Sequence, residues 1–344
     1  MTQTPTDLGG WDVHTHLIPP ALVEAVAEKA VFGMTTAAGT LRVCAHGVPL
    51  HPISDADKLV DRVARDGLDG ALVSVPPPLF RPDLGAGERR AYVAMINAGL
   101  RQACAAHGAR LRPLAYLPVE DPALAAEVAE QLDESLDESW AGVVIGTELL
   151  GRSYADADYA PLWTVLERRG LAAFLHPGTC PDARLDRHYL SNLLGNPYET
   201  TLAAADFILG GVFERHPRLT IVLAHGGGCA ATLAGRWQQG VLTKRPGVPE
   251  RTLLPRDALR RFYVDSLVHD PAYLDYLITV MGADRIVLGS DWPFPMGAAD
   301  ADHDLGHLDE ALRRKIRCAN AEAAFGRHRL RGGGTGRDAQ VAGG

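Results

Sequence analysis

The sequence lacks the features that mark several large classes of protein. No apolar run approaches the roughly 20 residues that span a bilayer, and residues 1–10 lack the charged-then-apolar layout of a secretory signal. The formal net charge is −8 and the Lys and Arg residues are dispersed, so no nucleic-acid footprint is visible. We therefore expect neither a membrane nor a nucleic-acid partner.

Cysteine is also scarce and carries no pairing pattern. The five cysteines are an odd number without a CxxC pair, and they are Cys44, Cys104, Cys180, Cys229 and Cys318. Such usage suits reduced thiols in a cytoplasmic protein better than a disulfide framework. The chain has 344 residues and is 47% hydrophobic, which is enough to bury a large core in one or two domains.

The chain contains a regular alternation of strand-like and helix-like segments. Strands are expected near 10–15, 69–75, 111–117, 141–146, 171–176, 219–225, 261–266 and 285–290. Helical patterns lie between them at 54–66, 87–107, 121–138, 159–170, 197–211, 227–240 and 270–281. Eight strands separated by helices imply parallel pairing through right-handed crossovers. An α/β fold of the (β/α)8 TIM-barrel type is the economical solution, and a doubly wound open sheet is the alternative.

The segment boundaries carry helix signals, and the length leaves residues to spare. Asp121 before Pro122 predicts a helix start, and Gly170 predicts a helix end. A barrel needs about 250 residues. We place the surplus in a loop inserted after the first strand (32–53), in extra helical structure (182–195), in one connection (241–256) and in a C-terminal helix (304–326). We expect a single domain over 1–330 and a disordered Gly-rich tail over 331–344.

Five of the polar residues that end these strands are able to bind a metal or move a proton. His14 and His16 lie at i and i+2 and so project from the same face of a strand. His176, His225 and Asp291 close three later apolar runs. A parallel barrel gathers the C-terminal ends of its strands on one face. The pattern therefore indicates a metalloenzyme.

The residues suggest different roles within this group. A metal ligated by three imidazoles and one carboxylate keeps one or two coordination positions open, which a catalytic zinc needs. Manganese also accepts such ligands. His225 precedes three glycines and suits an acid or base better than a ligand, although ligation is possible. Taken singly, His176 is equally well a buried histidine and Asp291 a helix cap. No lysine ends the fourth strand at 143–147, so one metal is expected rather than two bridged by a carboxylated lysine.

The combination of HxH, HP, AHGGG and GSDWPFP resembles the amidohydrolase superfamily. Within it, the likeness is to the 2-amino-3-carboxymuconate-6-semialdehyde decarboxylases and related metal-dependent decarboxylases. It extends from Val13 to about Phe325 and is sharpest at GNPYETT (195–201), GGVFER (210–215), LAHGGG (223–228) and LVHDP (267–271).

The resemblance implies roles for particular residues. It makes His14, His16, His176 and Asp291 the ligands of one divalent metal, usually zinc, with no organic cofactor. It makes His225 the group that deprotonates metal-bound water or carries a proton to the substrate. Arg236 matches an arginine that reaches the neighbouring subunit's site to bind a carboxylate, which implies a homodimer, and Phe294 lines the pocket.

The substrate-binding part departs from the family pattern. Leu41-Arg42-Val43 matches a segment that precedes a second substrate-binding arginine, but that arginine is missing here. His46, His51 and Arg42 are candidate replacements. His269 either reaches the pocket or caps a helix, and Asp265 nearby is a candidate to orient a ligand ring.

The resulting expectation is a metal-dependent, non-oxidative decarboxylase of a small unsaturated or aromatic carboxylate. Catalysis would use either metal-activated water or a substrate bound directly to the metal. In both cases His225 and Asp291 would transfer the proton. A hydrolase or hydratase of a lactone, cyclic amide or unsaturated diacid is the first alternative, because the same residues would serve it. A barrel that binds without catalysing is the second.

Overall fold

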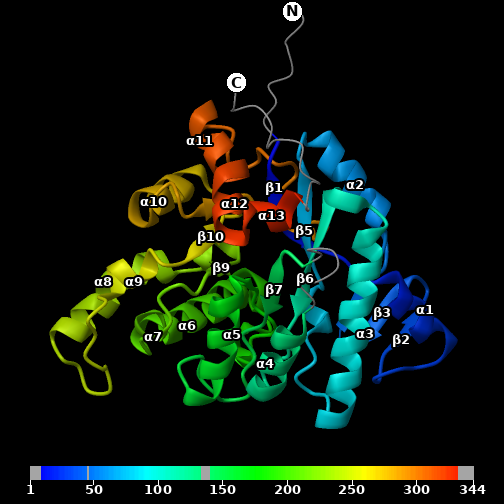
Figure 1. Ribbon diagram of the computed structural model, residues 1–344, viewed down its shortest axis with the longest axis horizontal. Helices are drawn as coiled ribbons and strands as arrows, with labels where there is room; N and C mark the ends of the chain where they lie inside the picture. Colours follow the sequence, from blue (N-terminus) through cyan, green and yellow to red (C-terminus); the bar gives the residue numbers. More distant parts are fainter. Residues whose placement is uncertain (1–8, 45, 133–139, 332–344) are drawn as a thin grey trace, which may run out of the picture.

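The computed structural model describes residues 9–44, 46–132 and 140–331. Eight parallel strands follow one another around a barrel (Figure 1). They are β1 (Trp11–His16), β5 (Gly70–Ser74), β6 (Leu111–Tyr116), β7 (Gly142–Ile145), β8 (Ala172–Leu175), β9 (Ile221–Leu223), β10 (Tyr263–Asp265) and β11 (Ile286–Val287). The tail predicted for 331–344 lies outside the described residues except for its first residue.

The first and last strands of this order meet, so the barrel closes. The backbone N–H of Val13 donates to the carbonyl of Leu288 at 2.9 Å, and that of Asp291 donates to the carbonyl of His14 at 2.8 Å. Thr15 and Trp292 form a further parallel bridge. The TIM-barrel prediction is therefore confirmed, and an open doubly wound sheet is excluded. Closure places the C-terminal ends of β1 and β11 side by side, which matters for the site.

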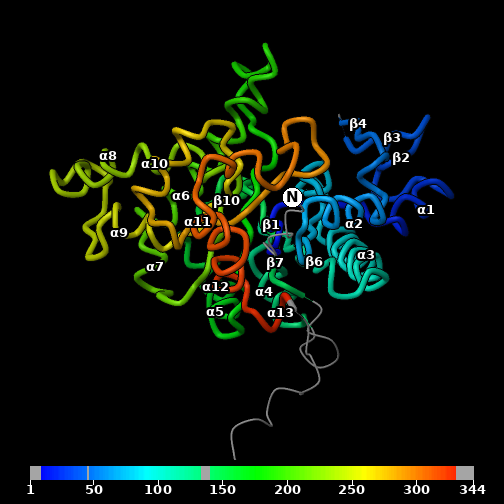
Figure 2. The backbone as a smooth tube through the Cα atoms, turned by 90° about the horizontal axis from the view of Figure 1, so that it is seen from above, coloured from blue at the N-terminus to red at the C-terminus, as the bar shows by residue number. Residues whose placement is uncertain are grey.

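Helices cover the outside of the barrel and connect successive strands (Figures 1 and 2). The longer ones are α2 (Ala56–Arg65), α3 (Ala86–Ala105), α4 (Pro122–Gln131), α5 (Ala160–Arg169), α6 (Asn196–Leu209), α8 (Ala230–Leu242) and α10 (Pro271–Met281). Asp121 accepts a hydrogen bond from the N–H of Leu124 at 3.1 Å, and Gly170 ends α5 in the left-handed conformation. Both predicted helix boundaries are confirmed.

The segment after β1 contains structure that the sequence analysis left out. Residues 32–53 were expected to form a loop, but they contain an antiparallel sheet of β2 (Thr35–Ala37), β3 (Thr40–Val43) and β4 (His46–Pro49). Its side chains Leu41, Val43 and Val48 are buried. The helix α1 (Pro20–Glu28) precedes it and buries Leu22 and Val26 at helical spacing. Short strands of this kind are stabilised by packing against the barrel, which local sequence patterns do not report.

The C-terminal region is helical, as expected, but the helix begins at Glu310 rather than at 304. It runs without a break through α11 (Glu310–Arg314), a π-helical segment at Lys315–Ala319 and α12 (Asn320–Phe325), and α13 (Arg327–Arg331) follows. Asp309 caps α11, so the helix begins later than predicted. The extra helical structure expected at 182–195 comprises short turns at Ala183–Leu185 and Ser191–Gly195, and the 241–256 connection leads into α9 (Pro255–Leu259).

All five cysteines are free thiols. Among the described residues, no helix combines the length and the apolar character that crossing a bilayer requires.

A buried arginine ties the N-terminal side of the barrel together. Arg317 is 2% exposed, and its guanidinium donates to the carbonyls of Gly9 at 3.1 Å and Asp66 at 2.8 Å and to Asp302 at 3.1 Å. We expect Arg317→Met to lower the free energy of unfolding by about 2–3 kcal/mol, because two partly buried carbonyls lose their donor. Asp302 itself can turn to solvent, so its share is small. Chemical denaturation would measure the change, and an unaltered midpoint would contradict this view.

Candidate active site

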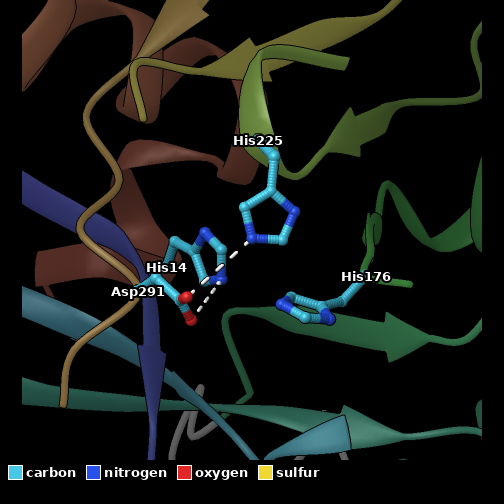
Figure 3. Close-up of side chains that lie close together, drawn as sticks. All are labelled: His14, His176, His225 and Asp291. Atoms are coloured by element: carbon cyan, nitrogen blue, oxygen red, sulfur yellow. Dashed lines mark ion pairs between the residues drawn. The ribbon is translucent and has the colours of Figure 1, made fainter. Parts of the chain in front are cut away.

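The ends of four barrel strands bring together the residues that the sequence singled out. His14 and His16 end β1, His176 follows β8, His225 follows β9 and Asp291 follows β11. Figure 3 shows the side chains of His14, His176, His225 and Asp291 pointing toward one another. Each of these four offers one ligand atom, and the four atoms lie within 4.8 Å of one another.

Asp291 lies at the centre of this cluster. Its Oδ1 is 3.2 Å from Nε2 of His14 and 3.0 Å from Nε2 of His16, while its Oδ2 is 3.9 Å from Nε2 of His225. The two oxygens of one carboxylate thus face different histidines. Oδ1 therefore faces the two histidines of β1, and Oδ2 faces His225.

The donor set fits a divalent metal. Nε2 of His14, His16 and His176 and Oδ1 of Asp291 are buried atoms that lack a hydrogen bond of good geometry within the described structure. Buried polar atoms are normally satisfied, so a group of them facing one another needs a ligand to explain it. Imidazole nitrogens and a carboxylate oxygen are the ligands that zinc and manganese accept.

The outer nitrogens of the same histidines are held by other groups. Nδ1 of His14 lies 2.7 Å from Oδ2 of Asp265, and Nδ1 of His16 lies 3.0 Å from the hydroxyl of Ser74. Nδ1 of His176 lies 2.8 Å from the carbonyl of Pro177. A proton held on Nδ1 by an acceptor leaves Nε2 with its lone pair directed toward the centre.

Asp265 also fixes the glycine-rich turn. Its Oδ1 accepts hydrogen bonds from the N–H of Gly226 at 2.9 Å and of Leu267 at 3.2 Å. One buried carboxylate therefore orients His14 and the segment that carries His225. Asp265 occupies the position that the sequence analysis proposed for a ring-orienting group.

Close packing and unusual backbone angles support the arrangement. A side chain at Gly289 would meet Cβ of Asp265 at 2.7 Å and Cβ of His14 at 2.9 Å, so only glycine allows that pair to approach. His225 and Asp291 have φ values of 55° and 58°, which side-chain-bearing residues rarely adopt. Such angles cluster at functional sites, where the surrounding structure holds them.

The electrostatics favour a positive charge inside the cluster. Although burial alone lowers the pKa of His14, the carboxylates of Asp291 and Asp265 raise it to about 10. Burial lowers the pKa of His176 and His16, so both rings are neutral near pH 7. Burial opposes ionisation of Asp291, but the charge and hydrogen bonding of His14 outweigh it and hold the pKa well below its usual range. A site that retains a proton this strongly also attracts a metal cation in its place.

A pocket of about 720 Å³ opens above the cluster and is lined by His176 and Asp291. Phe294 is among the lining residues, with its ring centroid 5.3 Å from that of His16. Several other lining residues are apolar, and they include Pro77, Pro78, Phe80, Pro177 and Met296. The pocket therefore suits a partly apolar molecule.

The pocket lining contains two basic residues that are candidates to replace the missing loop arginine. Of the three candidate replacements, His46 is among the lining residues that the structure describes, whereas Arg42 and His51 are not. Arg81 lines the pocket as well, and sequence reasoning missed it. It lies beyond the end of β5 and a short helical turn at Pro77–Leu79, so no strand-end motif in the sequence marks it.

Arg81 is held in a fixed orientation. Its Nε and Nη2 each donate to the carboxylate of Asp83 at 2.6 Å, and its Nη1 donates to the carbonyl of Phe32 at 2.9 Å. The guanidinium has five N–H groups, so this arrangement leaves donors for a further partner.

Two predicted substrate-binding residues lie outside this pocket. Arg236 is exposed on α8, a helix that lies at the edge of the molecule in Figure 1. His269 lines a smaller pocket of about 250 Å³, which also contains His225 and Asp291. It precedes Asp270, whose side chain caps α10, so the capping role belongs to Asp270.

The Asp265–His14 contact yields a direct prediction. We expect Asp265→Asn to weaken metal binding about 10- to 100-fold, because the amide no longer strengthens His14 as a donor. Metal titration of the stripped protein would measure this. Asp284→Asn, at an exposed carboxylate remote from the cluster, is the matched control. Equal affinity in both variants would contradict a role for Asp265.

Comparisons with known proteins agree with this geometry. The model of the Amidohydrolase family matches residues 11–327. The 2-amino-3-carboxymuconate-6-semialdehyde decarboxylase of Dictyostelium discoideum is 31% identical over 246 residues, covering 71% of this chain and 68% of that protein. The gamma-resorcylate decarboxylase of a Polaromonas strain is 27% identical over 290 residues, covering 78% and 86% respectively.

A solved structure extends the likeness to the whole fold. The apo form of Metarhizium anisopliae IDCase superposes with a TM-score of 0.76 at 25% identity and covers 94% of this chain and 97% of its own.

Proposed function

The chain belongs to the amidohydrolase family, and we propose that it is a metal-dependent, non-oxidative decarboxylase of a small unsaturated or aromatic carboxylate. The observation that carries the proposal is the set of buried, mutually facing atoms on His14, His16, His176 and Asp291 that have no hydrogen-bond partner of good geometry. The decarboxylases to which the chain is similar support the choice of reaction.

These four residues would hold one divalent metal, with zinc expected and manganese as the alternative. The metal, when bound, supplies Lewis-acid stabilisation of negative charge that develops on the substrate. No organic cofactor is needed for the reaction. The Nδ1 contacts described above keep the imidazoles in the orientation that this role requires.

His225 and Asp291 would move the proton. Oδ1 of Asp291 faces the β1 histidines, whereas Oδ2 faces His225, so the pair can share a proton without losing a ligand. A proton delivered to the carbon that bears the carboxylate interrupts the conjugation of the substrate. The bond to the carboxylate then breaks, CO₂ leaves, and the electron pair restores the conjugated system. The reaction needs no oxidant or reductant.

The pocket supports a substrate with a planar apolar body and a second polar group. Phe294 and the prolines of the pocket would contact the body, and Arg81 would bind the polar group in place of the missing loop arginine. We further propose a cytoplasmic homodimer in which Arg236 reaches the neighbouring site. Its exposure on α8, outside both pockets, is consistent with such a role.

The role of Arg81 is testable through substrate affinity. We expect Arg81→Met to raise KM about 10- to 100-fold with a smaller change in kcat, because it removes a charge-assisted hydrogen bond worth about 1.5–3 kcal/mol. Arg42→Met, on β3 outside the pocket lining, is the control. Steady-state kinetics with the accepted substrate would decide, and an unchanged KM in the Arg81 variant would remove Arg81 from substrate recognition.

The reaction itself is tested by CO₂ release from metal-loaded protein. The panel consists of hydroxybenzoates, aminobenzoates and carboxymuconate semialdehydes, with lactones and cyclic amides assayed for hydrolysis in parallel. We expect one CO₂ for each product molecule from at least one carboxylate. Hydrolysis of a lactone or amide without any CO₂ release would overturn the proposal in favour of a hydrolase.

A further inference from the structure

A second group of side chains that can ligate a metal lies apart from the central cluster, and one of its members, His269, lines the smaller pocket. His269, His303 and Asp304 each offer one ligand atom, and these atoms lie within 4.8 Å of one another. The two imidazole centroids are 6.2 Å apart with the rings inclined by 74°. The group shares no residue with the cluster around Asp291.

The three residues come from two loops on the same face of the barrel. His269 lies between β10 and α10, and the other two lie between β11 and α11. His269 has a φ of 58°, which turns it out of line with the preceding strand. The hydrogen bond from the N–H of Val268 to Oδ2 of Asp304, at 3.3 Å, already connects the loops.

The three candidate ligand side chains differ in how firmly they are held. Asp304 is 5% exposed and its carboxylate is held in place, while both histidines are exposed. Within the part of the chain that the structure describes, the imidazoles of His269 and His303 form no hydrogen bond or ion pair, in contrast to the neighbouring His307, which pairs with Asp275. One fixed carboxylate and two nearby imidazoles that are free to turn are sufficient to enclose an ion.

We propose that His269, His303 and Asp304 form a second divalent-metal site. Two nitrogens and one oxygen suit zinc, cobalt or nickel rather than calcium or magnesium, which prefer oxygen alone. Three protein ligands leave open positions for water or a carboxylate. The site is weaker than the central one, because binding must order two exposed side chains. Its ion would fasten together the two loops beside the pocket that contains His225.

Zinc titration of protein already loaded with one equivalent tests this inference. We expect the wild-type chain to bind a second, weaker equivalent in equilibrium dialysis and His303→Ala to bind none. His328→Ala, which removes an exposed histidine on α13, should retain the second equivalent. Asp304→Asn should lower the affinity while its amide oxygen still accepts from Val268.

The titration counts the central metal separately from the second one, so its outcome does not depend on the decarboxylase proposal. A wild-type chain that stops at one equivalent would overturn the second site. The same conclusion follows if His303→Ala takes up the second equivalent like the wild type, or if His328→Ala loses it to the same degree, because either result indicates unspecific surface binding.

Discussion

Asp291→Asn is expected to lower CO₂ release by about 10³-fold or more, because removal of a general acid–base group alone costs about 10²- to 10⁴-fold. The amide retains the shape of the side chain, but it carries no charge to bind a cation and no site to accept a proton. Oδ1 is 3.0–3.2 Å from two imidazole nitrogens and Oδ2 is 3.9 Å from a third. Both functions of the carboxylate are therefore lost together.

Two measurements accompany this variant. Metal content per chain should fall well below that of the wild type, and turnover should fall with it. Asp284→Asn makes the same chemical change at an exposed carboxylate and should alter neither quantity. Full metal content with near-normal turnover in Asp291→Asn would remove Asp291 from both proposed roles.

His225→Asn has the second largest expected effect and a different signature. If His225 carries the proton, kcat should fall about 10²- to 10⁴-fold while the metal content stays at the wild-type value. Asparagine tolerates the left-handed backbone that His225 adopts, so the turn is preserved. The measurement is metal analysis and single-turnover kinetics on the same preparation.

The alternative for His225 gives the opposite metal result. Its ligand atom lies within 4.8 Å of those of His14, His176 and Asp291, so the geometry also permits ligation. Loss of metal along with turnover would identify His225 as a ligand and overturn the proton-transfer role. His328→Asn, at an exposed position, should change neither metal content nor kcat.

The barrel and the cluster of candidate residues were predictable because both follow from short-range patterns. Apolar runs alternating with helices determine parallel strands, and parallel strands in a barrel end on one face. His14, His16, His176, His225 and Asp291 each stand at such an end. They come together because the barrel closes. Hydrogen bonds between the β1 and β11 segments establish this closure.

Features that depend on contacts between distant segments were harder to predict. The three-stranded sheet after β1 is stabilised by burying Leu41, Val43 and Val48 rather than by a strong local pattern. Arg81 lines the pocket, and its guanidinium is held there by Asp83 and by the carbonyl of Phe32, which comes from a distant segment. The group of His269 with His303 joins loops 34 residues apart in sequence, which local motifs do not relate.

The requirement for glycine at position 289 is another long-range effect. Its missing side chain makes room for both His14 and Asp265, which are separated by 251 residues. The motif around Asp291 indicated a site, but the reason for this glycine became visible only with the strands side by side.

Removal and return of the metal tests the central claim most directly. The protein is stripped with a chelator, assayed for CO₂ release on an accepted carboxylate, and then titrated with zinc or, separately, manganese. Our account predicts that release stops on stripping and recovers fully at one equivalent per chain. A stripped protein that releases CO₂ at the original rate would contradict it, because the atoms of His14, His16, His176 and Asp291 would then have another purpose.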